Sequence, residues 1–256
     1  MFSTAIYWCG LLCMFALEVA TVFANDLFDY ESDRNNAATG PFNGGSRVLV
    51  EGKLDFRYLR AGIAVALVAT LVCAGYVIRL APRPGATIVL LAVAFVLTLG
   101  YTVPPFKLCW RGLGEVDVAL SHSFMVLLFG FMLQGGRWFA PLPWLLAAPL
   151  CVAIVPAIVL SGLPDRSADA DAGKGTLPVR LGARAATWLA VALTVAAVVL
   201  VLIIARLAPV HGAYDAIIWG LLPYAGLLVL VLLRLLHQHP DVADRRIDGA
   251  MLVALG

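Results

Sequence analysis

The chain has 256 residues, of which 62% are hydrophobic and 13% charged, and its mean hydropathy is +0.92. These values exclude a soluble domain of this size, because such a domain needs a larger share of polar residues for its surface. The formal net charge is +2, and we find no basic face with interleaved aromatic residues, so we expect no nucleic-acid partner. The composition instead predicts an integral membrane protein with several passes.

Seven apolar runs are each long enough to cross a bilayer. We place them at residues 3–24, 58–78, 86–103, 116–134, 141–163, 185–208 and 214–236. Residues 249–256 resemble the start of another span, and no soluble domain or low-complexity linker interrupts the series. We therefore expect residues 1–256 to form one all-α domain, a polytopic transmembrane helical bundle with seven complete spans and a partial last one. The first run has no basic segment before it, which favours a retained helix over a signal peptide.

An acidic motif follows the first apolar run directly, with the sequence Asn-Asp-Leu-Phe-Asp-Tyr-Glu-Ser-Asp at residues 25–33. On one continuous helix, Asp26, Asp29 and Asp33 would fall within an arc of about 60°. Three like charges at the edge of a membrane repel one another unless a divalent cation neutralises them. Carboxylate oxygens favour Mg²⁺, which usually completes its shell with waters and substrate phosphates. The motif therefore predicts a magnesium site.

A second acidic motif follows the apolar run at 141–163. Asp165 and Asp169 would lie about 40° apart on a helix, whereas Asp171 would point about 120° away and is not a predicted ligand. The sequence Gly-Lys-Gly-Thr at 173–176 then supplies a flexible backbone and the cation Lys174. Two acidic motifs at the ends of two membrane helices predict paired Mg²⁺ ions that bind a diphosphate.

Polar residues inside the spans mark possible functional positions. Glu18 lies in the first span and either lines a substrate cavity or makes a hydrogen bond to a neighbouring helix. His122 lies inside the span at 116–134, where a contact between helices is as well supported as a substrate contact, so we leave it outside the predicted site. The five cysteines are scattered without a metal-binding spacing, which favours a packing role.

Basic residues are distributed unequally between alternate loops. Fourteen of the 18 Lys and Arg residues fall on the side that carries both acidic motifs, and the other side holds Arg79, Arg83, Arg137 and Arg206. Because cytoplasmic loops are enriched in Lys and Arg, this asymmetry predicts that both acidic motifs face the cytoplasm and that the N-terminus lies outside. We predict a multi-pass protein of the bacterial plasma membrane.

The two motifs together resemble a known family. Asn-Asp-x-x-Asp-x-x-x-Asp at 25–33 and Asp-x-x-x-Asp-x-x-x-Gly-Lys at 165–174 are similar to the signatures of the UbiA superfamily of intramembrane prenyltransferases, and the segments 101–115 and 176–182 also fit. The resemblance covers nearly the whole chain. It implies helices around a central cavity, in which the Asp motifs hold Mg²⁺ and an isoprenyl diphosphate. Compared with that family, we expect the chain to lack the first helix and to end within the last.

The resemblance implies an enzyme that uses Mg²⁺ to transfer an isoprenyl group from a polyprenyl diphosphate to an aromatic acceptor. The carboxylates are the implied metal ligands and, with Lys174, the implied catalytic residues: Asp26, Asp29, Asp33, Asp165 and Asp169. The implied substrate-binding residues are Asn25, Arg47, Tyr101, Lys107 and Arg180.

The glycine-rich segment 44–52 is most similar to the branch that prenylates 1,4-dihydroxy-2-naphthoate in menaquinone synthesis. A prenyl-diphosphate cyclase or phosphatase on the same scaffold would keep both motifs and is the alternative function. A non-enzymatic transporter would explain the helices but not two magnesium-type motifs on the same side. We expect the partners to be the two substrates and the lipid bilayer, with no obligate protein partner.

Overall fold

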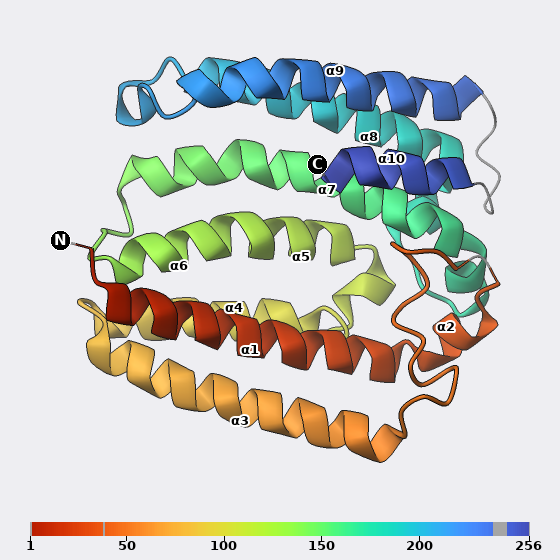
Figure 1. Cartoon of the computed structure of the whole chain (residues 1–256), viewed down its shortest axis with the longest axis horizontal. Helices are drawn as coiled ribbons and strands as arrows, with labels where there is room; N and C mark the ends of the chain where they lie inside the picture. The colour runs from red at the N-terminus through yellow and green to blue at the C-terminus, as the bar shows by residue number, and fades with distance from the viewer. Residues whose placement is uncertain (1, 38, 238–244, 256) are drawn as a thin grey trace.

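The computed structural model describes residues 2–37, 39–237 and 245–255, and within these ranges the chain folds into helices with no named strand. The helices lie side by side with their axes along one common direction (Figure 1). They are α1 (Thr4–Phe28), α2 (Tyr30–Asn35), α3 (Phe56–Leu80), α4 (Pro84–Gly100), η1 (Leu108–Arg111), α5 (Gly114–Leu120), η2 (Ser121–Met125), α6 (Val126–Leu133), α7 (Pro141–Asp171), α8 (Leu177–Ile204), η3 (Ala208–Val210), α9 (Asp215–His237) and α10 (Arg245–Leu255). The predicted all-α bundle is confirmed.

Six described helical segments are long and apolar enough to cross a membrane, namely α1, α3, the continuous segment Gly114–Leu133, α7, α8 and α9. The shorter apolar helix α4 has 17 residues and corresponds to the predicted run at 86–103. Helix α7 extends beyond its predicted apolar run, to Asp171. Helix α8 begins at Leu177 but is kinked at Gly182, whose backbone is not helical (φ 76°, ψ 161°), so its long apolar part begins close to the predicted residue 185. Hydropathy reports which residues prefer lipid, whereas a helix continues into water where its backbone hydrogen bonds persist.

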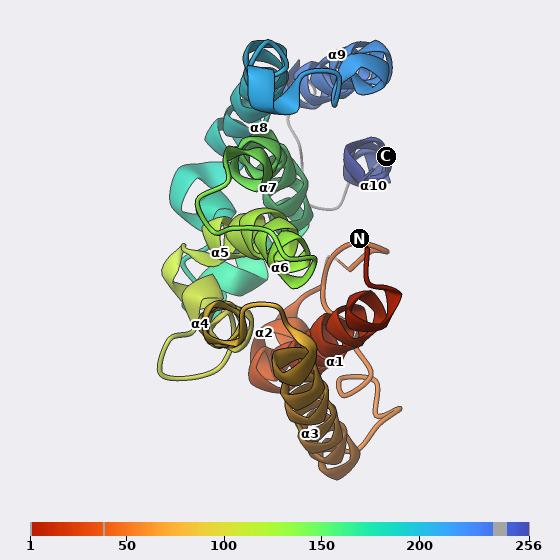
Figure 2. The ribbon, with the colours of Figure 1, turned by 90° about the vertical axis from the view of Figure 1, so that its left-hand side faces the viewer.

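The bundle has two large apolar cores. The first is built by α1, α3, α4, η2 and α6 around Leu17, Leu90 and Met132. The second is built by α7 to α10 around Leu160, Ala190 and Leu232. Viewed along the helices, α1, α3 and α4 form one group and α7, α8 and α9 form another, with α5 and α6 between them (Figure 2). Each half of the bundle carries one acidic motif. The packing of the two halves therefore decides how the motifs meet.

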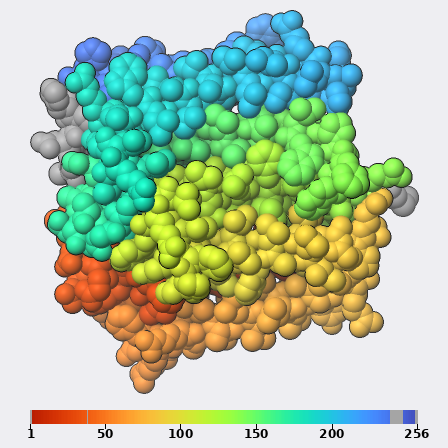
Figure 3. Space-filling view, turned by 180° about the vertical axis from the view of Figure 1, so that it is seen from behind, coloured from red at the N-terminus to blue at the C-terminus, as the bar shows by residue number. Residues whose placement is uncertain are grey.

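The outer surface of the bundle is apolar over most of the helix length. Large hydrophobic side chains such as Phe15, Val65, Leu71 and Trp219 are more than 60% exposed. Seen from behind, α5 and α6 lie between α4 and α8, and this face too is a continuous layer of helices (Figure 3). An apolar surface of this extent would drive aggregation in water, but lipid chains solvate it. The chain is therefore a multi-pass membrane protein.

Both acidic motifs lie at the same end of the bundle, on the right in Figure 1. The N-terminus and the connections α3–α4, α6–α7 and α8–α9 lie at the opposite end. This alternation agrees with the division of the loops between two sides of the membrane that was made from the sequence. Four basic residues, Arg79, Arg83, Arg137 and Arg206, therefore lie at or near the end of the bundle that does not carry the acidic motifs.

The predicted span at 116–134 is not a regular α-helix. Between α5 and α6 the chain forms the π-helical turn η2, which contains Ser121 and His122. Single π-helical turns inside α-helices are uncommon and occur often at functional sites, because the extra residue re-aims the side chains beside it. No sequence pattern considered above indicated this turn.

Candidate active site

The two acidic motifs are joined through the ammonium group of Lys174. Its Nζ atom lies 2.8 Å from Oδ2 of Asp29 and 3.3 Å from Oδ1 of Asp169, and all three side chains are buried. Burial alone would lower the pKa of Lys174, but the charges of Asp29 and Asp169 outweigh it and raise the pKa above its ordinary value. Lys174 is therefore a permanent cation held between the two halves of the bundle.

Two further contacts fix the orientation of these carboxylates. The indole Nε1 of Trp110 donates a hydrogen bond of 2.9 Å to Oδ1 of Asp29. The hydroxyl of Ser32 donates to Oδ1 of Asp169 at 3.1 Å. The loop of Trp110 is in turn tied to the Lys174 loop, because the amide of Gly175 donates to the Trp110 carbonyl at 2.9 Å. Neither Trp110 nor Ser32 carries a sequence signal that predicts this role.

Asp33 and Asp165 complete a small acidic chamber. Asp165 accepts hydrogen bonds from the side chain of Asn36 at 2.7 Å, the side chain of Asn43 at 3.2 Å and the amide of Gly44 at 3.1 Å. Burial, and after it the charge of Asp29, raises the pKa of Asp33 to about 7. A cation bound nearby would lower the pKa of Asp33 again, because it stabilises the ionised carboxylate.

Gly45 is required beside Asp33 for steric reasons. A Cβ atom at this position would overlap the Asp33 carboxylate, and the backbone has a positive φ of 67° that favours glycine. The glycine-rich loop therefore approaches the acidic chamber more closely than any other residue type would permit.

Asp26 lies apart from the other predicted ligands. Its carboxylate accepts hydrogen bonds from the amide and the hydroxyl of Ser46. Helix α1 ends at Phe28 and α2 begins at Tyr30, so the expected single helical face for Asp26, Asp29 and Asp33 is interrupted at Asp29. As a result Asp26 lines the neighbouring cavity, whereas Asp29 and Asp33 line the acidic chamber.

The other predicted basic residues contact the protein rather than the chamber. Arg47 donates to the backbone carbonyl of Asp33 at 3.0 Å. Lys107 lies 3.8 Å from the centre of the Trp110 ring. Arg180 donates at 2.7 Å to the carbonyls of Gly175 and Arg111. In this arrangement Arg180 holds the loops on both sides of the chamber together.

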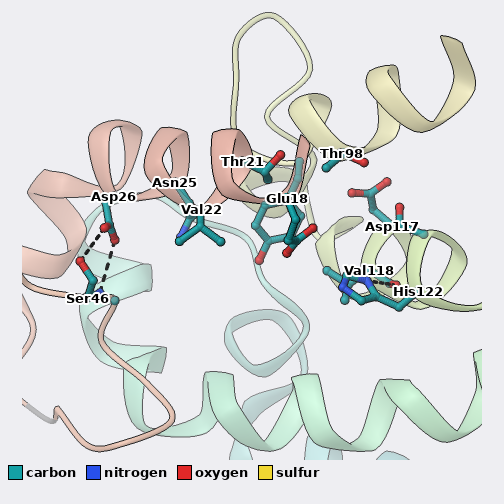
Figure 4. A pocket seen from close by; sticks show the side chains of 13 residues that line it. Glu18, Thr21, Val22, Asn25, Asp26, Ser46, Thr98, Asp117, Val118 and His122 are labelled. Atoms are coloured by element: carbon teal, nitrogen blue, oxygen red, sulfur yellow. Dashed lines mark hydrogen bonds between the residues drawn. The ribbon is translucent and has the colours of Figure 1, made fainter. Parts of the chain in front are cut away.

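Three cavities adjoin one another inside the bundle. The acidic chamber, of about 130 Å³, is lined by Asp29, Asp33, Asp165, Asp169 and Lys174 among others. It shares Asn25, Gly45 and Tyr101 with a polar cavity of about 390 Å³ between α1, α4 and α5 (Figure 4). The polar cavity shares Val118 and His122 with an apolar cavity of about 500 Å³ among α7, α8 and α9. A ligand with a charged end, a ring and an apolar tail has a matching environment for each part.

The structure adds two carboxylates that the sequence analysis did not single out. Glu115 accepts a hydrogen bond of 2.7 Å from the amide of Leu177 at the start of α8, and it also lines the acidic chamber. Asp117 is 4% exposed and lines the polar cavity together with Glu18. The rule that marked Glu18, a carboxylate inside a predicted span, applies equally to Asp117 and would have found it.

The acidic chamber fits a hard divalent cation by its chemistry. Four carboxylates from two motifs face one small chamber, and Mg²⁺ is bound by one or two carboxylates plus water and phosphate rather than by a closed protein cage. Within the described residues, no group of three or more His, Cys, Asp or Glu side chains is placed so that it could hold a metal ion by itself. The donor set therefore suits a cation that shares its coordination with an anionic ligand.

The fold and site define a class of protein, a polytopic membrane protein with a buried acidic chamber at one end of its bundle. The chain belongs to the UbiA prenyltransferase family, whose match covers residues 1–255. It is 27% identical over 187 residues to the 1,4-dihydroxy-2-naphthoate octaprenyltransferase of Haemophilus influenzae. That alignment covers 68% of this chain and 56% of the relative, so the chain spans little more than half the length of the curated relative that it matches.

Solved structures of UbiA homologues share the fold. A homologue from Aeropyrum pernix K1 matches 100% of this chain and 88% of its own length, with a TM-score of 0.71 and 19% identity. A homologue from Archaeoglobus fulgidus, bound to GPP and Mg²⁺, matches 99% of this chain and 89% of its own length, with a TM-score of 0.69 and 17% identity. The predicted family and fold are confirmed.

Proposed function

We propose that this protein transfers an isoprenyl group from a prenyl diphosphate to an aromatic acceptor. The observation that carries the proposal is the acidic chamber, in which Lys174 bridges Asp29 and Asp169 beside a polar and an apolar cavity. The binding of GPP and Mg²⁺ by the Archaeoglobus homologue supports the same ligands in this chamber. The apolar cavity among α7, α8 and α9 would take the prenyl chain.

In this mechanism Lys174 offers its ammonium group to the diphosphate, which accumulates charge as the allylic C–O bond breaks. Asp29, Asp33, Asp165 and Asp169 would hold Mg²⁺, which supplies further charge neutralisation to the same leaving group. The surrounding helices exclude water from the allylic carbon. A carbon of the acceptor ring then forms the new C–C bond with its own electron pair, and the ring proton leaves afterwards.

We propose a hydroxynaphthalene ring as the acceptor. The likeness to the naphthoate octaprenyltransferase supports this ring system and a role in quinone-type lipid synthesis. The polar cavity, which adjoins the acidic chamber through Asn25 and Tyr101, is the corresponding binding space.

A single assay tests the function. Purified protein in detergent is incubated with Mg²⁺ and a labelled prenyl diphosphate, with and without 1,4-dihydroxynaphthalene or 1,4-dihydroxy-2-naphthoate. We expect a prenylated ring only when an acceptor is present. Release of diphosphate with a cyclic or hydrolysed prenyl product, and no ring product, would instead support the cyclase or phosphatase alternative.

Removal of the Tyr101 hydroxyl tests the division of the site into two parts. Tyr101 lines both the acidic chamber and the polar cavity, and its phenol can donate a hydrogen bond to a ligand there. We expect Tyr101→Phe to raise the KM for the acceptor about fivefold or more, since one hydrogen bond contributes about 1 kcal/mol. The KM for the prenyl diphosphate should change less than twofold. A variant that weakens only diphosphate binding would contradict this division.

The active site is proposed to face the cytoplasm, on the basis of the charge asymmetry between alternate loops. We expect a cysteine at the exposed position Lys53, in a variant without native cysteines, to resist a membrane-impermeant maleimide in intact cells. A cysteine at the exposed position Arg137, at the other end of the bundle, should react under the same conditions. Labelling at Lys53 and protection at Arg137 would reverse the proposed orientation.

A further inference from the structure

Asp117 is a buried residue with an unsatisfied carboxyl oxygen. It lies in the first turn of α5 and is 4% exposed, and its Oδ1 atom has no hydrogen-bond partner among the residues that the structure describes. Figure 4 shows its carboxyl group beside Thr98 in the polar cavity, on the side where Glu18 lies. Burial of a polar atom without a hydrogen-bond partner costs free energy. The structure therefore indicates that a hydrogen-bond donor of a ligand contacts Oδ1 of Asp117.

His122 adds an imidazole ring to the same wall. Its Nδ1 atom lies 3.0 Å from the carbonyl of Val118. A carbonyl oxygen can only accept, so Nδ1 donates in this contact and the Nε2 atom is the ring nitrogen that remains for a ligand. The π-helical turn η2, which begins at Ser121, brings this ring to the cavity.

The polar cavity is lined by several carboxyl groups. Its acidic lining residues are Glu18, Asp26 and Asp117, and none of the described residues that line it is Lys or Arg. The ammonium of Lys174 belongs to the acidic chamber, where Asp29 and Asp169 already surround it. A carboxylate on the acceptor would therefore lie among other carboxyl groups without a Lys or Arg to pair with, whereas a hydroxyl group would meet hydrogen-bond acceptors.

We propose that this cavity selects an uncharged hydroxyarene, which donates a hydrogen bond from a ring hydroxyl to Asp117. The inference rests on the proposed function, because it takes the acceptor-binding space to be this cavity. It separates the chain from an enzyme that uses a carboxylate-bearing ring. Asp117 is then a specificity-determining residue that contacts the acceptor.

Ligand binding tests the proposal without any requirement for turnover. Isothermal titration calorimetry of the purified full chain would compare 2-naphthol, 6-hydroxy-2-naphthoate and methyl 6-hydroxy-2-naphthoate. The carboxylate of the second compound cannot reach its own hydroxyl group, and the ester provides a neutral molecule of at least the same size. We expect both neutral compounds to bind at least tenfold more tightly than the carboxylate.

The substitution Asp117→Asn keeps the shape of the side chain and removes its charge. We expect it to weaken the binding of 2-naphthol. We also expect the affinity for the ester to exceed the affinity for the carboxylate by threefold or less. The matched control is Asp215→Asn, the same change at an exposed position at the opposite end of the bundle, which should leave all three affinities unchanged.

Three outcomes would overturn the inference. These are tighter binding of the carboxylate than of its ester by the unsubstituted protein, no binding of either neutral compound, and an unchanged ratio in a folded Asp117→Asn variant. The first two need no variant, so misfolding of Asp117→Asn does not protect the proposal.

Prenylation of a carboxylate acceptor in preference to a neutral one would overturn the inference while the proposed function stands. Selective binding without any prenylated product would overturn the proposed function alone.

Discussion

Substitution of Asp29 by alanine is expected to lower kcat/KM by at least about a hundredfold, which corresponds to about 2.7 kcal/mol of transition-state stabilisation. Asp29 accepts hydrogen bonds from Lys174 at 2.8 Å and from Trp110 at 2.9 Å, and it faces the chamber that suits Mg²⁺. Its removal therefore disturbs the lysine and the metal site together. The measurement is steady-state turnover with saturating Mg²⁺ and a saturating acceptor.

Asp171→Ala is the matched control for Asp29→Ala. Asp171 is the last residue of α7, two positions after Asp169, and its side chain is exposed. Turnover of this variant should stay within about twofold of the unsubstituted protein, because surface substitutions away from a site have small effects. Full activity of Asp29→Ala in excess EDTA would show that neither the carboxylate nor a divalent cation is needed.

Lys174→Met is expected to impair both stability and turnover. The change removes the ammonium group and leaves Asp29 and Asp169 buried without their shared cation. Loss of one partner from a buried ion pair typically costs about 3 kcal/mol or more, which lowers the melting temperature of a protein of this size by about 6 °C or more. The affinity for the prenyl diphosphate should fall by at least about tenfold, since a charge-assisted contact is lost.

The control for this change is Lys53→Met. Lys53 also pairs with a carboxylate, Glu51, at 2.6 Å, but both side chains are exposed to solvent. Exposed ion pairs contribute little, so we expect the same melting temperature and turnover as for the unsubstituted chain. Equal behaviour of the two methionine variants in thermal denaturation and in the assay would contradict the bridging role of Lys174.

The sequence predicted the features of this protein that depend on local spacing. The long apolar runs identified the membrane helices, since the bilayer sets the length of a span. The acidic residues after the first and fifth runs identified both motifs, and four of their five carboxylates do meet in one chamber. Helix ends were predicted less well, because α7 continues as a helix beyond its apolar residues and a short helical segment precedes the kink at Gly182 in α8.

Three site features escaped the sequence analysis, for different reasons. Asp117 could have been found, because a carboxylate inside a predicted span is a signal that needs no structure. Trp110 could not, because its contact with Asp29 joins residues 81 positions apart. The separation of Asp26 from Asp29 and Asp33 also required coordinates, since it arises from the interruption between α1 and α2.

The sequence by itself determined the class of this protein, its span positions and the residues of its two acidic motifs, because composition and short spacings carry that information. Only the tertiary structure decided which groups meet. The packing of the two half-bundles sets Lys174 between Asp29 and Asp169, and it turns Asp117 toward a separate cavity. These contacts join segments that are far apart in the chain, so no local pattern specifies them, and they depend on the shapes of two apolar cores.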